Sequence, residues 1–101
     1  MARIVLERSF DPETGKAEFA RQAEELQSCI ETREVRPIRS VIASDFSRSY
    51  CEFEAPDADT LRAACRRAGV EFERVWKAEE LDWTGVNPVE YLRTLVSEEP
   101  T

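Results

Sequence analysis

The chain has 101 residues, of which 42% are hydrophobic and 35% are charged, and this composition predicts one folded domain rather than a disordered segment. The formal net charge is −7, and no clustered face of lysine and arginine indicates nucleic-acid binding. No apolar run approaches the roughly 18 residues of a membrane helix, and residues 1–10 lack the apolar stretch of a secretory signal. We therefore expect a cytoplasmic protein whose partners include neither nucleic acid nor a membrane.

Two features of the composition limit the chemistry. The chain contains no histidine, which removes the commonest general base and excludes Ser-His-Asp and Cys-His catalysis. Its cysteines, Cys29, Cys51 and Cys65, are odd in number and fit no short metal or redox motif. We expect them to be reduced and to lie on the core side of the fold as small hydrophobic residues. A soft-metal site built from the three thiolates is the less favoured alternative.

The first half of the chain predicts a strand, a helix and a second strand. Residues 3–10 predict a strand, with Ile4, Leu6 and Phe10 at one parity and Val5, Glu7 and Ser9 at the other. A helix should then run from Asp11 and Pro12, a favourable start, to about residue 32, although Gly15 could delay its regular turns. Its apolar side chains recur at helical spacing, and they are Phe19, Ala23, Leu26 and Ile30. Residues 37–45 predict a second strand, and the proline at its beginning suits the edge of a sheet.

The second half of the body repeats this pattern. Residues 49–55 predict a third strand that forms a hairpin with the second. A second helix should begin after Asp57, which can cap it, and should end at Gly69. Residues 72–79 alternate as a last strand. The body therefore ends at about residue 80.

Residues 81–101 predict an acidic C-terminal extension. Residues 79–101 contain six acidic side chains and one basic side chain, a net charge of −5. Asn87 and Pro88 are typical of the start of a short helix. A helix this short is marginal in water by itself, so we expect it to pack on another surface.

The order strand, helix, strand, strand, helix, strand predicts a ferredoxin-like α+β fold. Right-handed crossovers favour a four-stranded antiparallel sheet with both helices on one face. The other face should combine valines with charged residues, and we expect it to carry Val5, Val41, Val75, Glu7, Arg39, Glu52 and Lys77. Such a face suits contact with a second copy better than bulk solvent. We therefore predict a homodimer, a dimeric α+β barrel that encloses a cavity.

Two stretches of the sequence resemble a family of small bacterial proteins of unknown function, one branch of which is described as nickel-binding. They are residues 4–10, IVLERSF, and residues 50–69, YCEFEAPDADTLRAACRRAG, in a resemblance that extends over about residues 3–79. The most specific part is the run of strand, Ala-Pro-Asp, helix and Ala-Gly. The resemblance supports the dimeric ferredoxin-like barrel and implies Glu7, Tyr50 and Glu52 as pocket residues.

This chain departs from the family at one position. Family members usually have a histidine within the second helix, where this chain has Ala64. A nickel site that depends on imidazole therefore does not carry over, and we predict no metal ligand.

Four residues form the predicted ligand-binding site, and they are Glu7, Arg39, Tyr50 and Glu52. Two carboxylates in one cavity can share a proton, bind a hard cation or hold a cationic ligand. The alternative is that each carboxylate forms an ion pair with Arg39, Lys77 or an arginine of a partner subunit. Tyr50 is either a hydrogen-bonding group of the pocket or an aromatic residue that favours strands.

Other side chains carry weaker indications. Arg8 and Arg39 could bind an anionic ligand through forked hydrogen bonds, or could form surface or interface ion pairs. Trp76 and Trp83 could line an apolar ligand site, or could anchor a core or an interface.

Three functions remain open from the sequence, which identifies neither a cofactor nor catalytic residues. We favour a dimer whose cavity binds a small organic molecule or a metal. The second is a small cofactor-free enzyme whose acid–base work falls to Glu7, Glu52 or Tyr50. The third is a ligand-free interaction module that uses the C-terminal helix, and exposure of its apolar stripe would favour it. This stripe consists of Val89, Leu92 and Val96.

Overall fold

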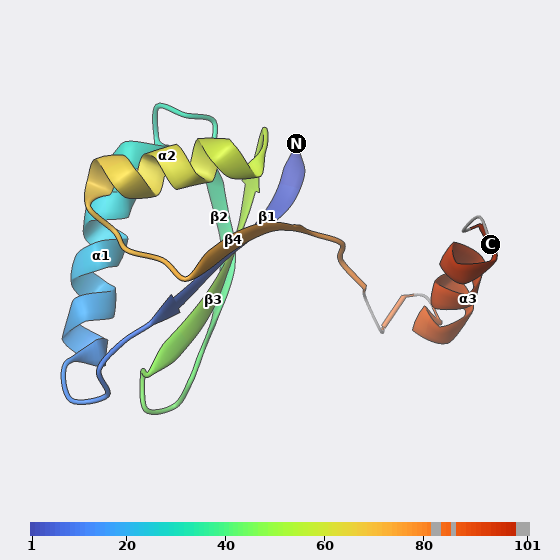
Figure 1. Ribbon diagram of the computed structural model, residues 1–101, viewed down its shortest axis with the longest axis horizontal. Coiled ribbons are helices and arrows are strands. Elements are labelled where there is room, and N and C mark those ends of the chain that lie inside the picture. Colours follow the sequence, from blue (N-terminus) through green and yellow to red (C-terminus); the bar gives the residue numbers. More distant parts are fainter. Residues whose placement is uncertain (82–83, 86, 99–101) are drawn as a thin grey trace.

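The computed structural model describes residues 1–81, 84–85 and 87–98, so Trp83 lies outside the described residues. The elements follow the predicted order, with a helix at the end: β1 (Ala2–Ser9), α1 (Gly15–Ile30), β2 (Arg36–Ile42), β3 (Arg48–Ala55), α2 (Ala58–Ala68), β4 (Arg74–Ala78) and α3 (Pro88–Glu98). The strands form one antiparallel sheet in the order β2-β3-β1-β4. Helices α1 and α2 cover the same face of it (Figure 1). The predicted α+β fold is confirmed, and we call the face away from α1 and α2 the open face.

The hydrophobic core lies between the sheet and the two covering helices. Side chains on this side of β1 and β3 are fully or nearly fully buried, and they include Ile4, Leu6, Cys51 and Phe53. From α2, Leu61 and Cys65 reach the same core with no exposed surface. All three cysteines are free, and Cys29 is partly buried against the core. Their predicted location on the core side is confirmed.

Helix α2 begins and ends as its sequence predicts. The Asp57 carboxylate accepts a hydrogen bond from the backbone N–H of Thr60 at 2.7 Å, which satisfies one of the free donors of the first turn. Gly69 follows the last turn with φ of 71°, a conformation that glycine adopts without steric cost.

Helix α1 begins at Gly15, the residue that could delay its regular turns, and the predicted cap at Asp11 was wrong. Asp11 does not cap the helix, because its carboxylate accepts a hydrogen bond from the N–H of Glu13 at 2.9 Å and closes a local turn. The helix begins at Gly15, which packs directly against the turn between β2 and β3. A Cβ at this position would overlap the carbonyl oxygen of Phe46. The sequence indicated Gly15 but not its contact with Phe46, and this close approach determines where α1 starts.

The predicted orientation of β4 was wrong. Directly opposed residues of antiparallel strands point to the same face. Trp76 opposes Val5 on the open face, whereas Val75 opposes Leu6 and is buried under the helices. Arg74 and Trp76 therefore replace Val75 and Lys77 on the open face. The misleading residue was Phe72, which packs against the core from the segment before β4 and does not belong to the strand.

Helix α3 lies apart from the sheet and from α1 and α2 (Figure 1). Its apolar stripe of Val89, Leu92 and Val96 is exposed. This exposure was the observation expected to favour an interaction module that uses the C-terminal helix. Among the described residues, no helix is long and apolar enough to span a membrane.

Candidate ligand groove on the open face of the sheet

A groove of about 600 Å³ crosses the open face of the sheet. Its lining contains all four residues of the predicted site, together with four others, and consists of Val5, Glu7, Arg39, Val41, Tyr50, Glu52, Arg74 and Trp76. The sheet register explains this grouping, because Glu7 lies opposite Tyr50 and Arg39 lies opposite Glu52. We call this feature the ligand groove.

Glu7 is a nearly buried carboxylate near the centre of the groove, with only 8% of the residue exposed. Its Oε2 accepts a hydrogen bond from the indole Nε1 of Trp76 at 2.5 Å and lies 3.4 Å from Nε of Arg74. No described residue donates a hydrogen bond to its other oxygen, Oε1. Glu7 therefore retains one carboxylate oxygen that can accept a donor from a ligand.

Glu52 is differently engaged. Its Oε2 accepts a short hydrogen bond from Nε of Arg39, and its Oε1 lies 3.6 Å from a terminal nitrogen of Arg3. The Glu52 carboxylate raises the pKa of Arg39, mainly through this hydrogen bond, so the guanidinium stays charged. For Glu52 the structure therefore agrees with the alternative prediction, in which the carboxylate forms an ion pair with an arginine. Both oxygens of the Glu52 carboxylate are therefore engaged by arginines, whereas Glu7 keeps one oxygen without a described donor.

The walls of the groove are largely apolar. Tyr50, Trp76 and Val41 each keep about half of their surface exposed on this face. Trp76 matters twice, because its ring lines the groove and its N–H fixes Glu7. Its position was missed in the sequence, since the alternation around Phe72 assigned it to the wrong side.

Arg8 does not join Arg39. The two guanidinium groups lie on opposite faces of the sheet, and Arg8 is only 3% exposed beneath the covering helices. The prediction that they act together on one anion was wrong. The sequence does contain the relevant signal, because Arg8 has the same strand parity as the core residues Ile4 and Leu6.

The donor set of this chain does not fit a nickel site. Nickel binds well to imidazole, and the sequence has no histidine. Within the part of the chain that the structure describes, no three Cys, Asp or Glu side chains are grouped so that they could hold a metal ion.

A protein-family model described as "Nickel responsive protein SCO4226-like" matches residues 5–78 of the chain. The chain belongs to this SCO4226-like family. The match confirms the resemblance found in the sequence. A search of curated proteins found no match.

A solved structure supports the fold of this SCO4226-like chain. The crystal structure of SCO4226 from Streptomyces coelicolor A3(2) superposes with a TM-score of 0.65 at 12% sequence identity. The match covers 80% of this chain and 100% of that chain. At this identity the likeness concerns the fold, and it fits the ferredoxin-like architecture of the dimeric-barrel type.

Proposed function

We propose that this protein forms a homodimer through the open faces of two sheets, and that the enclosed grooves bind a small organic ligand. The observation that carries the proposal is Glu7, a nearly buried carboxylate whose Oε2 is fixed by Trp76 and whose Oε1 is free of described donors. An oriented acceptor in a largely apolar groove is typical of small-molecule sites. The ligand class that fits is a flat molecule with one hydroxyl, amide or amine donor for Glu7.

The partner that fits the open face is a second copy of the chain. Val41, Tyr50 and Trp76 would leave water in such a dimer, which favours association. The charges are also complementary, because Arg39 and Arg74 are exposed on the two edge strands while Glu7 and Glu52 lie on the central strands. Closure would remove water from the groove and strengthen a hydrogen bond to Glu7.

Helix α3 fits the same dimer as an additional contact. Its exposed stripe needs a cover, and residues 79–101 carry a net charge of −5 that complements exposed arginines on the open face. We infer that the partner subunit covers the apolar stripe of α3. The C-terminal extension would then serve an interaction, but with the other subunit of the dimer and not with an unrelated protein.

Native mass spectrometry of protein purified without a tag tests this function. We expect a dimer with a reproducible mass above twice the denatured mass, because a bound organic molecule adds its own weight. In Glu7→Met the added mass should be lost while the dimer remains. The matched control is Glu54→Met, since Glu54 lies on the same face but pairs with Arg36 and does not line the groove.

The same spectra give the contrary outcomes. A monomer at micromolar concentration would refute the barrel, bare dimers would refute the bound ligand, and an added mass equal to nickel would refute the organic ligand. For α3, Leu92→Asp should lower the dimer fraction more than Thr94→Asp, which adds the same charge off the stripe. Equal effects would mean that the stripe makes no dimer contact.

A further inference from the structure

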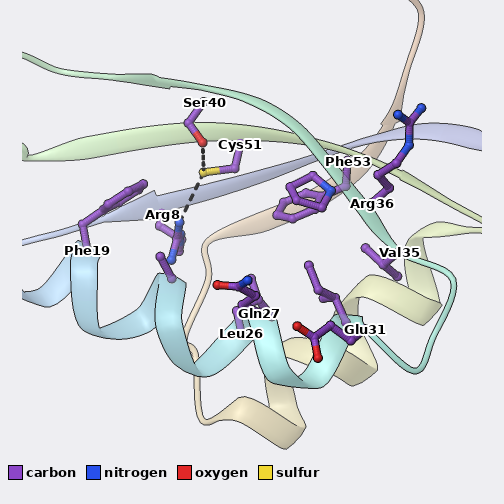
Figure 2. A pocket seen from close by; sticks show the side chains of 13 residues that line it. Arg8, Phe19, Leu26, Gln27, Glu31, Val35, Arg36, Ser40, Cys51 and Phe53 are labelled. Carbon is purple, nitrogen blue, oxygen red and sulfur yellow. Dashed lines mark hydrogen bonds between the residues drawn. The ribbon is translucent and has the colours of Figure 1, made fainter.

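A second cavity lies on the opposite side of the sheet, between α1 and the strands β2 and β3 (Figure 2). Its volume is about 390 Å³, within the range of roughly 300–1,000 Å³ that holds small organic ligands. The walls are mainly apolar and include Leu26, Ile30, Val35 and Phe53. Figure 2 shows Arg8 with Ser40 and Cys51 at one end of this cavity, and Glu31 with Arg36 at the other. We call it the α1 cavity.

Arg8 is a buried cation that has no acidic partner among the described residues. Its two terminal nitrogens donate hydrogen bonds to Oε1 of Gln22 at 2.9 Å and to Sγ of Cys51 at 3.2 Å. Its Nε is buried and has no hydrogen-bond partner. The guanidinium carbon also lies 5.5 Å and 4.9 Å from the ring centres of Phe10 and Phe19.

Nearby acidic side chains do not compensate this charge. Glu18 accepts a hydrogen bond from the Gln22 amide at 3.2 Å and is itself paired with Arg21, and it forms no ion pair with Arg8. At the far end of the cavity, Arg36 is paired with Glu54. Contacts with neutral dipoles and aromatic rings offset only part of the cost of removing a guanidinium from water. The site therefore has unused donor capacity and an uncompensated positive charge.

We propose that the α1 cavity binds a small amphipathic monocarboxylate. Its carboxylate pairs with Arg8, since a guanidinium binds this planar anion through two parallel hydrogen bonds. Its apolar body lies along Leu26, Ile30 and Phe53. The small polar share of the walls disfavours phosphate esters and sugars, which need more donors than this cavity offers. The ligand groove lies on the other face, so this proposal does not depend on the dimer or on Glu7.

Isothermal titration calorimetry of the full chain with octanoate tests the proposal, and 1-octanol is the matched probe without charge. We expect octanoate to bind at least about tenfold more tightly than 1-octanol, because the alcohol lacks the ion pair with Arg8. In Arg8→Met, octanoate affinity should fall to that of 1-octanol. Equal binding of the two probes by the wild-type protein, or no binding of octanoate, would overturn the proposal.

A second pair of variants leaves the core intact. Ala23 is an exposed residue of α1 that lines the cavity, whereas Ala20 is an exposed residue of the same helix that does not. Ala23→Phe should fill the entrance and abolish octanoate binding, and Ala20→Phe should retain it. Retention of binding in Ala23→Phe would contradict the assigned cavity.

Discussion

Glu7 and Arg8 are consecutive residues of β1 and are both nearly buried, yet the two sides of the sheet treat their charges differently. On the open face, Glu7 receives an indole N–H and lies near the guanidinium of Arg74. On the helix side, Arg8 has an amide, a thiol and two rings as neighbours and no described carboxylate. Alternation along one strand thus separates two opposite charges that cannot neutralise each other. The Glu7 charge is balanced within the chain by Arg74, whereas the Arg8 charge has no acidic partner among the described residues.

We expect the two sides of the sheet to differ most in how much stability is lost when an apolar side chain is shortened to alanine. Leu6→Ala on the helix side should lower the free energy of unfolding by about 2–5 kcal/mol, because Leu6 is fully buried and a cavity would remain. Val41→Ala on the open face should change it by less than about 0.5 kcal/mol in dilute monomer, since Val41 is 58% exposed. Urea unfolding of both variants measures the difference. A comparable loss in Val41→Ala would mean that the open face is already part of the core.

The helix side should also respond to alkaline pH. Burial raises the pKa of the Cys65 thiol from 9.0 to about 11, against the opposing effect of the Arg8 charge. Between these values the unfolded thiol loses its proton while the folded thiol keeps it, so ionisation stabilises the unfolded state. Folding stability should therefore fall by roughly 2–3 kcal/mol as the pH rises from 9 to 11. Unfolding curves of wild type and Cys65→Ala measure it, and the advantage of the wild type should shrink over this window. A constant difference would show that Cys65 does not titrate differently in the two states.

A smaller effect is expected at the open face. Trp76→Phe keeps an aromatic ring but removes the N–H that binds Glu7, and should cost about 1 kcal/mol of unfolding free energy. A double-mutant cycle with Glu7→Met, which has no oxygen to accept this N–H, isolates the interaction. Additive effects of the two substitutions would mean that the Trp76–Glu7 hydrogen bond contributes nothing to stability.

Local patterns were sufficient for most of the fold. The alternation in β3 and the cap at Asp57 depend on neighbours in sequence, and the structure agrees with them, whereas residues 4–8 of the central strand β1 are all buried. The predicted cap at Asp11 was wrong because an aspartate is compatible with both a cap and a turn, whereas the delay at Gly15 was foreseen as an alternative. Contact between Gly15 and the distant Phe46 decides between them, and such a contact is not visible in a single sequence.

The candidate groove was predicted in part. Strand parity correctly grouped Glu7, Arg39, Tyr50 and Glu52, because β1 and β3 are the central strands. It failed for β4, where Trp76 is positioned by its pairing with Val5 and not by its sequence neighbours. The burial of Arg8 was missed because a charged residue was assumed to lie at the surface, although its parity indicated the core.

The contact between Gly15 and Phe46 has a consequence for the ancestry and engineering of this protein. Phe46 has φ of 59°, and its carbonyl oxygen occupies the space that a side chain at position 15 would need. The hairpin turn and the start of α1 are therefore not separable modules. A transplanted turn of different shape would either collide with the helix or leave a gap at the Phe10–Phe19–Phe46 ring cluster. Among descendants of this chain, Gly15 should therefore change only where the backbone of the turn at residue 46 also changes its path.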